Sequence, residues 1–187
     1  VLRLLLPEEP EVAGLLGLLR LTEARREARV RNGQLVPLGE QDRAGWDRGL
    51  IAEGHDLVRE CLAINRPGRY QILAAINAVH TDAPTASDTD WSQVVALYDQ
   101  LTRLDPSPIV ALNRAVAVAE LDGPEVGLAL VDGLPLTGYH AWHAARADLL
   151  RRLGRSAEAK EAYDAAIAAT QNSAERAYLS RKRGELV

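Results

Sequence analysis

The chain has 187 residues, of which 47% are hydrophobic and 26% are charged, and its formal net charge is −4. This composition is ordinary for a folded protein with a buried core, and it excludes a disordered tail. Because acidic and basic residues are mixed along the chain, it has neither the basic patch of a direct DNA-binding protein nor a polybasic membrane anchor.

The numbers of cysteine and methionine residues bear on the cellular location of the chain and on whether it is a fragment. Cys61 is the single cysteine, which excludes an internal disulfide framework and favours a reducing, cytoplasmic location. The chain has no methionine and opens on an apolar run over residues 1–6, too short for a signal peptide. No stretch approaches the roughly 20 apolar residues of a membrane span. We interpret the opening as the cut end of a helix and expect the chain to be a C-terminal fragment of a longer protein.

Apolar spacing and capping residues predict a chain of helices. The first helix is expected to begin at Pro10, and the last to run from Asn172 almost to the end of the chain. Between them, helices are expected over 42–65, 70–80, 90–104, 109–121, 124–133, 139–153 and 156–170, with Asp42 as the N-cap of the first of these. Asn32 and Gly33 lie between two short segments and predict a minor β-hairpin near 28–38. Leu62 and Cys61 are placed on the apolar face of the helix over 42–65. The apolar stripe of the helix over 90–104 is expected to contain Val94, Leu97, Tyr98, Leu101 and Leu104.

Residues 140–171 resemble a tetratricopeptide repeat, a pair of helices with a period of about 34 residues. Ala147 is expected where the first helix approaches its partner, and Gly154 at the turn. The second helix has Ala159, Tyr163 and Ala166 at its small, aromatic and small positions. Residues 109–134 are interpreted as the preceding repeat, although they lack the aromatic residue, and residues 94–106 as the second half of the repeat before that.

These patterns predict an all-α fold in which antiparallel helical hairpins stack as a tetratricopeptide-like right-handed solenoid. Two parts of one continuous body are expected: an N-terminal helical subdomain over 1–88, and repeats with a C-terminal capping helix over 89–187. The alternative is a bundle of helical hairpins without a superhelical groove, which is also all α.

Polar residues near the starts of several predicted helices form a candidate interaction groove. Its members are Arg69, Tyr70, Gln71, Asn113, Arg114, His143 and Arg146. The first helices of tetratricopeptide pairs line the concave face of the array, so these side chains are candidates to contact a ligand peptide. Alternatively, Asn113 and Arg146 satisfy buried loop carbonyls and hold adjacent repeats in register.

A second cluster, Asp42, Arg43, Trp46 and Asp47, is a candidate surface epitope. The alternative interpretation is structural, with Asp42 as a helix cap, Arg43 and Asp47 paired one turn apart, and Trp46 buried.

Catalytic and metal chemistry have little support in the sequence. His140 and His143 are three residues apart and Asp148 follows, but a closed zinc site needs four ligands and no other histidine or cysteine is near. A capping or polar role is favoured for them, and a core role for Cys61. There is no glycine-rich phosphate loop, no pair of carboxylates at a strand end, and no nucleophile with a nearby base. We therefore expect no enzymatic activity, no metal and no cofactor.

Several segments in order resemble the long C-terminal extension of one group of extracytoplasmic-function-type bacterial RNA polymerase sigma factors, of the sigma-70 family. They are residues 6–12 (LPEEPEV), 40–43 (EQDR), 46–48 (WDR), 68–71 (GRYQ), 107–117 (SPIVALNRAVA), 139–140 (YH) and 149–155 (LLRRLGR). The resemblance covers nearly the whole chain.

This resemblance implies a non-catalytic regulatory module for transcription initiation. In the family, two N-terminal regions bind the polymerase core and the promoter, and both are absent from this sequence. The implied partners are the polymerase core, those N-terminal regions or a regulatory protein, with DNA contacted only through the absent regions and no membrane involved. Two alternatives remain: a free-standing tetratricopeptide-type scaffold that binds peptide termini, and a small-molecule sensor built on Arg69, Asn113 and Arg146.

Overall fold

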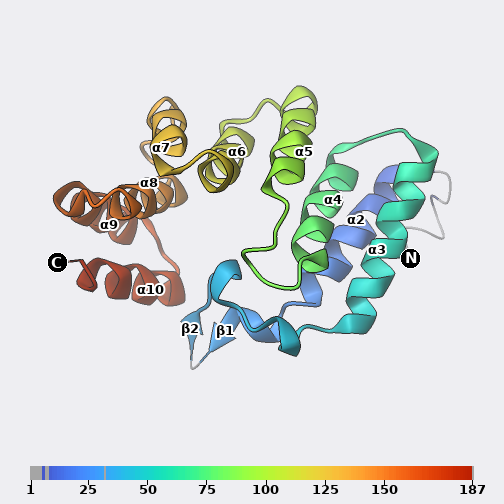
Figure 1. The fold of residues 1–187 in the computed structure, drawn as a ribbon, viewed down its shortest axis with the longest axis horizontal. Coiled ribbons are helices and arrows are strands. Elements are labelled where there is room, and N and C mark those ends of the chain that lie inside the picture. Colours follow the sequence, from blue (N-terminus) through green and yellow to red (C-terminus); the bar gives the residue numbers. More distant parts are fainter. Residues whose placement is uncertain (1–5, 7–8, 32, 187) are drawn as a thin grey trace. The chain divides into compact units, whose positions relative to one another are not determined.

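The structure is a computed structural model that describes residue 6, residues 9–31 and residues 33–186. It confirms an all-α fold with a minor hairpin (Figure 1). Its helices are α2 (Pro10–Glu23), α3 (Arg48–Ile64), α4 (Arg69–Asp82), α5 (Trp91–Leu104), α6 (Pro108–Leu121), α7 (Pro124–Asp132), α8 (His140–Arg152), α9 (Ser156–Ala169) and α10 (Ser173–Gly184). Strands β1 (Val30–Arg31) and β2 (Gln34–Leu35) pair as a two-stranded sheet. The predicted opening over 1–5 and the turn residue Asn32 lie outside the described residues.

Three helices begin at the capping residues predicted from the sequence directly before them. The Ser107 hydroxyl accepts a hydrogen bond from the Val110 N–H at 3.3 Å, directly before Pro108 opens α6. Asp90 accepts from the Gln93 N–H at 3.0 Å, and Asn172 accepts from the second and third amides of α10. Each bond satisfies an amide that has no partner within its helix.

The predicted helix over 42–65 was wrong at its start. Asp42 caps a short 3-10 turn over Arg43–Gly45. The backbone is extended at Trp46, and α3 begins at Arg48 with Asp47 as its N-cap. At the other end Asn65 adopts a left-handed conformation, with φ of 53°, and its N–H bonds to the carbonyls of the last turn. This geometry terminates helices and is tolerated by Asn better than by most residues.

The chain divides into two compact units. The first contains α2 to α5, in the described residues up to Val30 together with Val36–Pro106. The second contains β2, which packs against α10, and helices α6 to α10, in Arg31–Leu35 and the described residues from Ser107 onward. The division therefore falls after α5, a helix that the sequence grouped with the repeats but that packs on α4 in the first unit.

Small residues allow close helix packing in the first unit. Ala13, Gly14 and Gly17 lie on the buried face of α2, which packs against both α3 and α4. At Gly54 of α3 an added Cβ would lie 2.5 Å from Cγ of Leu21, so the two helices approach closely here. Two predicted apolar-face residues are instead exposed, Leu62 by 68% and Leu104 by 52%. Both lie near the C-terminal ends of their helices.

The second unit has the predicted repeat packing. Ala147, Ala159, Tyr163 and Ala166 are buried in one cluster between α8 and α9. Gly154 has φ of 72° in the connecting turn, a conformation that glycine adopts without a Cβ clash.

Among the described residues, no helix is both long enough and apolar enough to cross a membrane.

Candidate interaction groove

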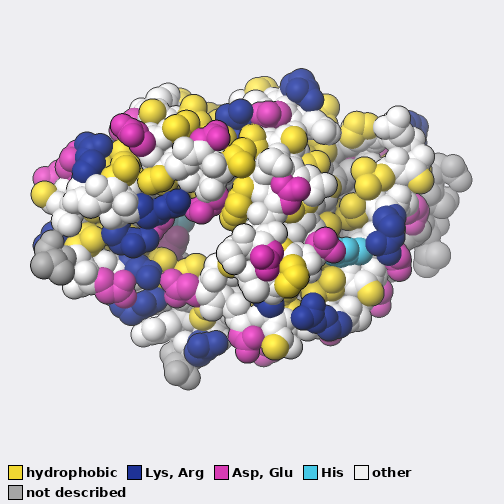
Figure 2. Space-filling model, in the orientation of Figure 1, with side chains coloured by type: hydrophobic (Ala, Val, Ile, Leu, Met, Phe, Trp, Pro, Cys, Tyr) yellow, Lys and Arg dark blue, Asp and Glu magenta, His cyan; other side chains and the backbone are white. Residues whose placement is uncertain are grey.

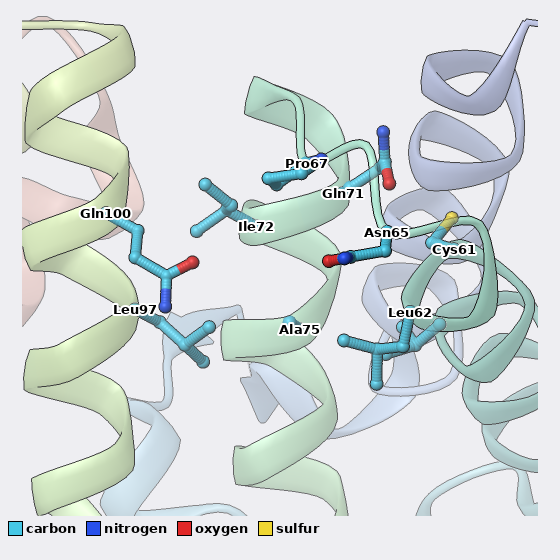
Figure 3. Close-up of a pocket in the computed structure, with 10 residues that line it drawn as sticks. Cys61, Leu62, Asn65, Pro67, Gln71, Ile72, Ala75, Leu97 and Gln100 are labelled. Carbon is cyan, nitrogen blue, oxygen red and sulfur yellow. The ribbon is translucent and has the colours of Figure 1, made fainter.

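A groove in the first unit runs over α4 between the C-terminal part of α3 and the middle of α5 (Figure 3). Its volume is about 270 Å³, and it is open on one side. The residues that line it are Val58, Cys61, Leu62, Asn65, Pro67, Gln71, Ile72, Ala75, Leu97 and Gln100. None of these ten is charged, so the groove is an uncharged, largely apolar surface.

The N-terminus of α4, at one end of the groove, is capped by a residue of another helix. The N-cap position is Gly68, which has no side chain to accept a hydrogen bond. The Glu11 carboxylate of α2 instead accepts from the Tyr70 N–H at 2.9 Å and from the Gln71 N–H at 3.1 Å. A Cβ at Gly68 would lie 2.2 Å from Cδ of Glu11, so only glycine leaves room for this carboxylate. The contact positions α4 against α2 and sets the floor of the groove.

Three predicted site residues lie at this end of the groove. Gln71 lines it and is buried; its Nε2 donates to the Arg66 carbonyl at 2.8 Å. Arg69 forms an ion pair with Asp105 at 3.2 Å, which links the start of α4 to the residue after α5. Tyr70 is 38% exposed. Arg69 therefore already has a carboxylate partner, and Gln71 has a structural role.

Two groove residues were missed by the sequence analysis. The carboxamides of Asn65, at the end of α3, and Gln100, on α5, point into the groove from opposite sides (Figure 3). Neither side chain has a hydrogen-bond partner within the part of the chain that the structure describes. Asn65 carried one usable signal, because Asn directly before Arg66 and Pro67 is typical of a helix C-terminus. Nothing in the local sequence marked Gln100.

The other predicted groove residues belong to the second unit. Arg146 of α8 pairs with Asp132 of α7 at 2.7 Å, and the His143 ring contacts the Thr137 carbonyl at 2.7 Å. Asn113 is exposed on α6, and Arg114 is partly buried there. Arg146 thus joins adjacent helices through a carboxylate rather than a loop carbonyl, whereas His143 is the residue that contacts a loop carbonyl.

Charges of both signs are mixed on the second unit (Figure 2). Arg152 pairs with Glu120 at 2.6 Å, and Arg155 pairs with Glu158 at 2.6 Å. A ligand that bound these arginines would have to displace an existing carboxylate, which lowers the gain from any new ion pair.

The candidate surface epitope is largely a structural cluster. Trp46 is buried, and the Arg43 guanidinium lies 4.7 Å from the centre of its ring. Arg43 also donates to the carbonyls of His80 and Ala83 at the end of α4. Asp42 and Asp47 remain exposed, and each accepts a backbone amide as a cap. Arg43 therefore links the segment before α3 to the C-terminus of α4 through hydrogen bonds.

A buried cationic environment lies beside this cluster. Burial and the nearby Arg25 and Arg43 lower the pKa of His80 to about 4, and its ring packs edge-on against Trp91 at 5.3 Å. Burial, with smaller repulsion from Arg29 and Arg43, lowers the pKa of Arg25 to about 10. Arg25 donates to Oδ1 of Asn77 at 2.7 Å. His80 is therefore neutral at physiological pH, as its surroundings require.

The two histidines at the start of α8 do not converge on one point. His140 Nδ1 lies 3.1 Å from Oε1 of Glu175 in α10, while His143 faces Thr137 and Asp148 pairs with Arg151. Among the described residues, no group of three or more His, Cys, Asp or Glu side chains is arranged to hold a metal ion. The Cys61 thiol is buried and donates to the Pro10 carbonyl at 3.8 Å, with no base among the other groove residues.

Comparison with known proteins gives relatives without an assigned activity. Residues 1–62 match the model of a family of unknown function (DUF6596). An uncharacterized protein of Rhizobium meliloti is 47% identical over 178 residues, which cover 94% of this chain and 42% of that protein. The chain thus spans less than half the length of this relative. No solved structure matches the chain significantly.

Proposed function

We propose that this chain is a non-catalytic regulatory module of an extracytoplasmic-function-type sigma factor and acts in the bacterial cytoplasm by protein contact. The observation that carries the proposal is the ordered series of sigma-like segments along nearly the whole sequence. The module contacts the polymerase core, the promoter-binding regions of the same factor or a regulatory protein.

Two of those segments contact each other in the structure, which supports the proposal. Glu11 belongs to the segment over 6–12, and Gly68 and Gln71 belong to the segment over 68–71. The Glu11 carboxylate accepts hydrogen bonds from the second and third amides of α4, in the space that Gly68 leaves open. The two segments therefore meet in one contact of the fold, which gives their joint presence in the sequence a physical reason.

The length of the Rhizobium relative also suits the proposal. More than half of that protein lies outside the matched part, which is room for further regions such as those that bind promoter DNA in sigma factors. The groove supports the contact role, because it is open, has no charged lining residue and presents two carboxamides that no described residue bonds to.

The test starts from the gene. We expect its full reading frame to encode two helical promoter-binding regions upstream of this module, and the full-length protein to direct RNA polymerase core to a promoter in a reconstituted transcription assay. Removal of the module is expected to change the transcript yield. A full reading frame without such regions, or a full-length protein that neither binds polymerase nor alters transcription, would refute the proposal and favour the free-standing scaffold.

A further inference from the structure

We infer that the groove over α4 binds an extended, uncharged segment of polypeptide that inserts an aliphatic side chain between Ile72, Ala75 and Leu97. The inference concerns the chemistry of the occupant. It does not rest on the sigma-factor proposal, because the bound segment is defined by its charge, size and backbone conformation, whichever protein supplies it.

Charge is the first constraint on the occupant. None of the ten residues lining the groove is charged, and the nearby Arg69 is already paired with Asp105. A charged group brought into this surface would lose its hydration without gaining an ion-pair partner. The bound part of the ligand is therefore uncharged, which excludes recognition through a free terminal carboxylate or amino group.

Size and continuity favour a polymer over a small molecule. Pockets that enclose small ligands typically have volumes of about 300–1,000 Å³, and this groove, at about 270 Å³, is smaller and open. Both helices that form its walls also carry an exposed leucine near their C-terminal ends. Leu62 of α3 is 68% exposed, and Leu104 of α5, two turns beyond Leu97, is 52% exposed. One aliphatic side chain occupies the part of the groove between Ile72, Ala75 and Leu97, while the rest of a longer chain extends toward these leucines.

The two carboxamides specify an extended backbone. A carboxamide offers both a donor and an acceptor, as a peptide group does. Asn65 and Gln100 present these groups from opposite walls (Figure 3). An extended segment has unpaired N–H and C=O groups along both edges and alternates its side chains between two faces. It can therefore bond to both amides while one side chain points to the floor, whereas a helix pairs its backbone groups internally.

The conformation of Asn65 fixes one of these amides. Asn65 is the one residue other than glycine with positive φ in the part of the chain that the structure describes, and its N–H is bonded to the end of α3. Because the backbone is held there, the point at which its side chain leaves the groove wall is fixed. Glycine tolerates the same backbone conformation, so Asn65→Gly removes the carboxamide without removing the helix C-cap.

The probe is a blocked pentapeptide, acetyl-Gly-Ser-X-Ser-Gly-amide, with X as Leu, Ile, Val, Asp or Lys. Binding to the 15N-labelled 187-residue chain is followed by amide chemical shifts. With X as Leu, Ile or Val we expect saturable shifts at the amides of Ala75 and Leu97. With X as Asp or Lys we expect at least tenfold weaker binding. A leucine peptide with a free carboxylate should gain no affinity over the blocked form.

Five variants test the contacts, three in the groove and two as controls outside it. Asn65→Gly and Gln100→Ala should each weaken binding about threefold to tenfold, the loss expected for a hydrogen bond, whereas Gln93→Ala, an exposed amide at the start of α5, should not. Leu62→Asp should weaken it at least tenfold, whereas Leu19→Asp, at a leucine of α2 that is 56% exposed and lies outside the groove, should not.

Three results would overturn the inference. The first is an absence of shifts at the groove with every aliphatic peptide. The second is equal binding of the aspartate or lysine peptide. The third is a dimer in sedimentation experiments that Leu62→Asp dissociates, because the occupant would then be a second copy of the chain. Failure of the transcription assay leaves these outcomes unchanged, so the two proposals fail separately.

Discussion

The cap of α4 by Glu11 allows a quantitative prediction about two residues that lie far apart in the chain, Glu11 and Gly68. Glu11→Ala removes the acceptor of two amides at the start of α4, at 2.9 and 3.1 Å. Loss of an N-cap acceptor costs about 1 kcal/mol, and loss of a negative charge at a helix N-terminus costs about 0.3–1 kcal/mol. The free energy of unfolding should therefore fall by about 1–2 kcal/mol.

Gly68→Ala should act on the same contact from the other side. The backbone at Gly68 has φ of −126°, which alanine adopts without strain. The added Cβ, however, would lie 2.2 Å from Cδ and 2.4 Å from Oε1 of Glu11, and must displace the carboxylate. We expect a loss of about 1 kcal/mol, reduced somewhat because alanine lowers the entropy of the unfolded chain.

The double variant tests this reasoning. Once Glu11 is alanine, the Cβ at position 68 meets no carboxylate, so the second substitution should cost almost nothing or stabilise slightly. The coupling energy in the double-mutant cycle should be about 1 kcal/mol. Urea unfolding followed by circular dichroism measures it, with Glu23→Ala as a control, because Glu23 makes an exposed pair with Arg26 worth less than about 0.5 kcal/mol. Additive losses, or a neutral Glu11→Ala, would refute the proposed cap.

Three further outcomes are expected. Gly127→Ala should destabilise the second unit by about 1–3 kcal/mol in urea unfolding, because its Cβ would lie 2.3 Å from Cβ of Ala119, whereas Gly133→Ala, with no neighbour closer than 3.5 Å, should be nearly neutral. Folding lowers the pKa of His80 from 6.5 to about 4, so the unfolded chain binds this proton first as the pH falls, and the free energy of unfolding should decrease by about 2 kcal/mol between pH 7.5 and pH 5. In His80→Leu this part of the pH dependence should vanish, and an unchanged profile would contradict the assignment. Arg43→Lys should reduce the free energy of unfolding by about 1–2 kcal/mol and so lower the midpoint of thermal unfolding, because lysine cannot reproduce both carbonyl contacts and the stacking on Trp46. An unchanged midpoint would show that Arg43 does not hold the segment before α3 in place.

Signals that act over a few residues were readable in the sequence. Ser107 before Pro108, Asp90 three residues before Gln93, and Gly154 at a turn all appear where predicted. Each depends on the bond geometry of a single turn. The burial of Ala147, Ala159 and Tyr163 also followed from sequence, since the periodicity of a helix pair largely dictates which side chains face each other.

The start of α3 shows where such signals become ambiguous. Asp42 and Asp47 are both good N-caps, and both do cap helical turns. Between the two caps the backbone is extended at Trp46, which is buried beneath Arg43, and the long helix begins only after it. Arg43 in turn is held by carbonyls at the end of α4, a contact between segments about forty residues apart that local patterns do not encode.

Local patterns were enough to predict the all-α class, most helix boundaries, the minor hairpin and one residue of the groove, Gln71. Tertiary structure decided which other residues accompany it. Asn65 and Gln100 share a surface because α3 and α5 pack on either side of α4, and Glu11 completes a helix that begins far along the chain. The physical reason is that capping and periodicity are local interactions, whereas a groove is defined by side chains that meet only after the helices have packed.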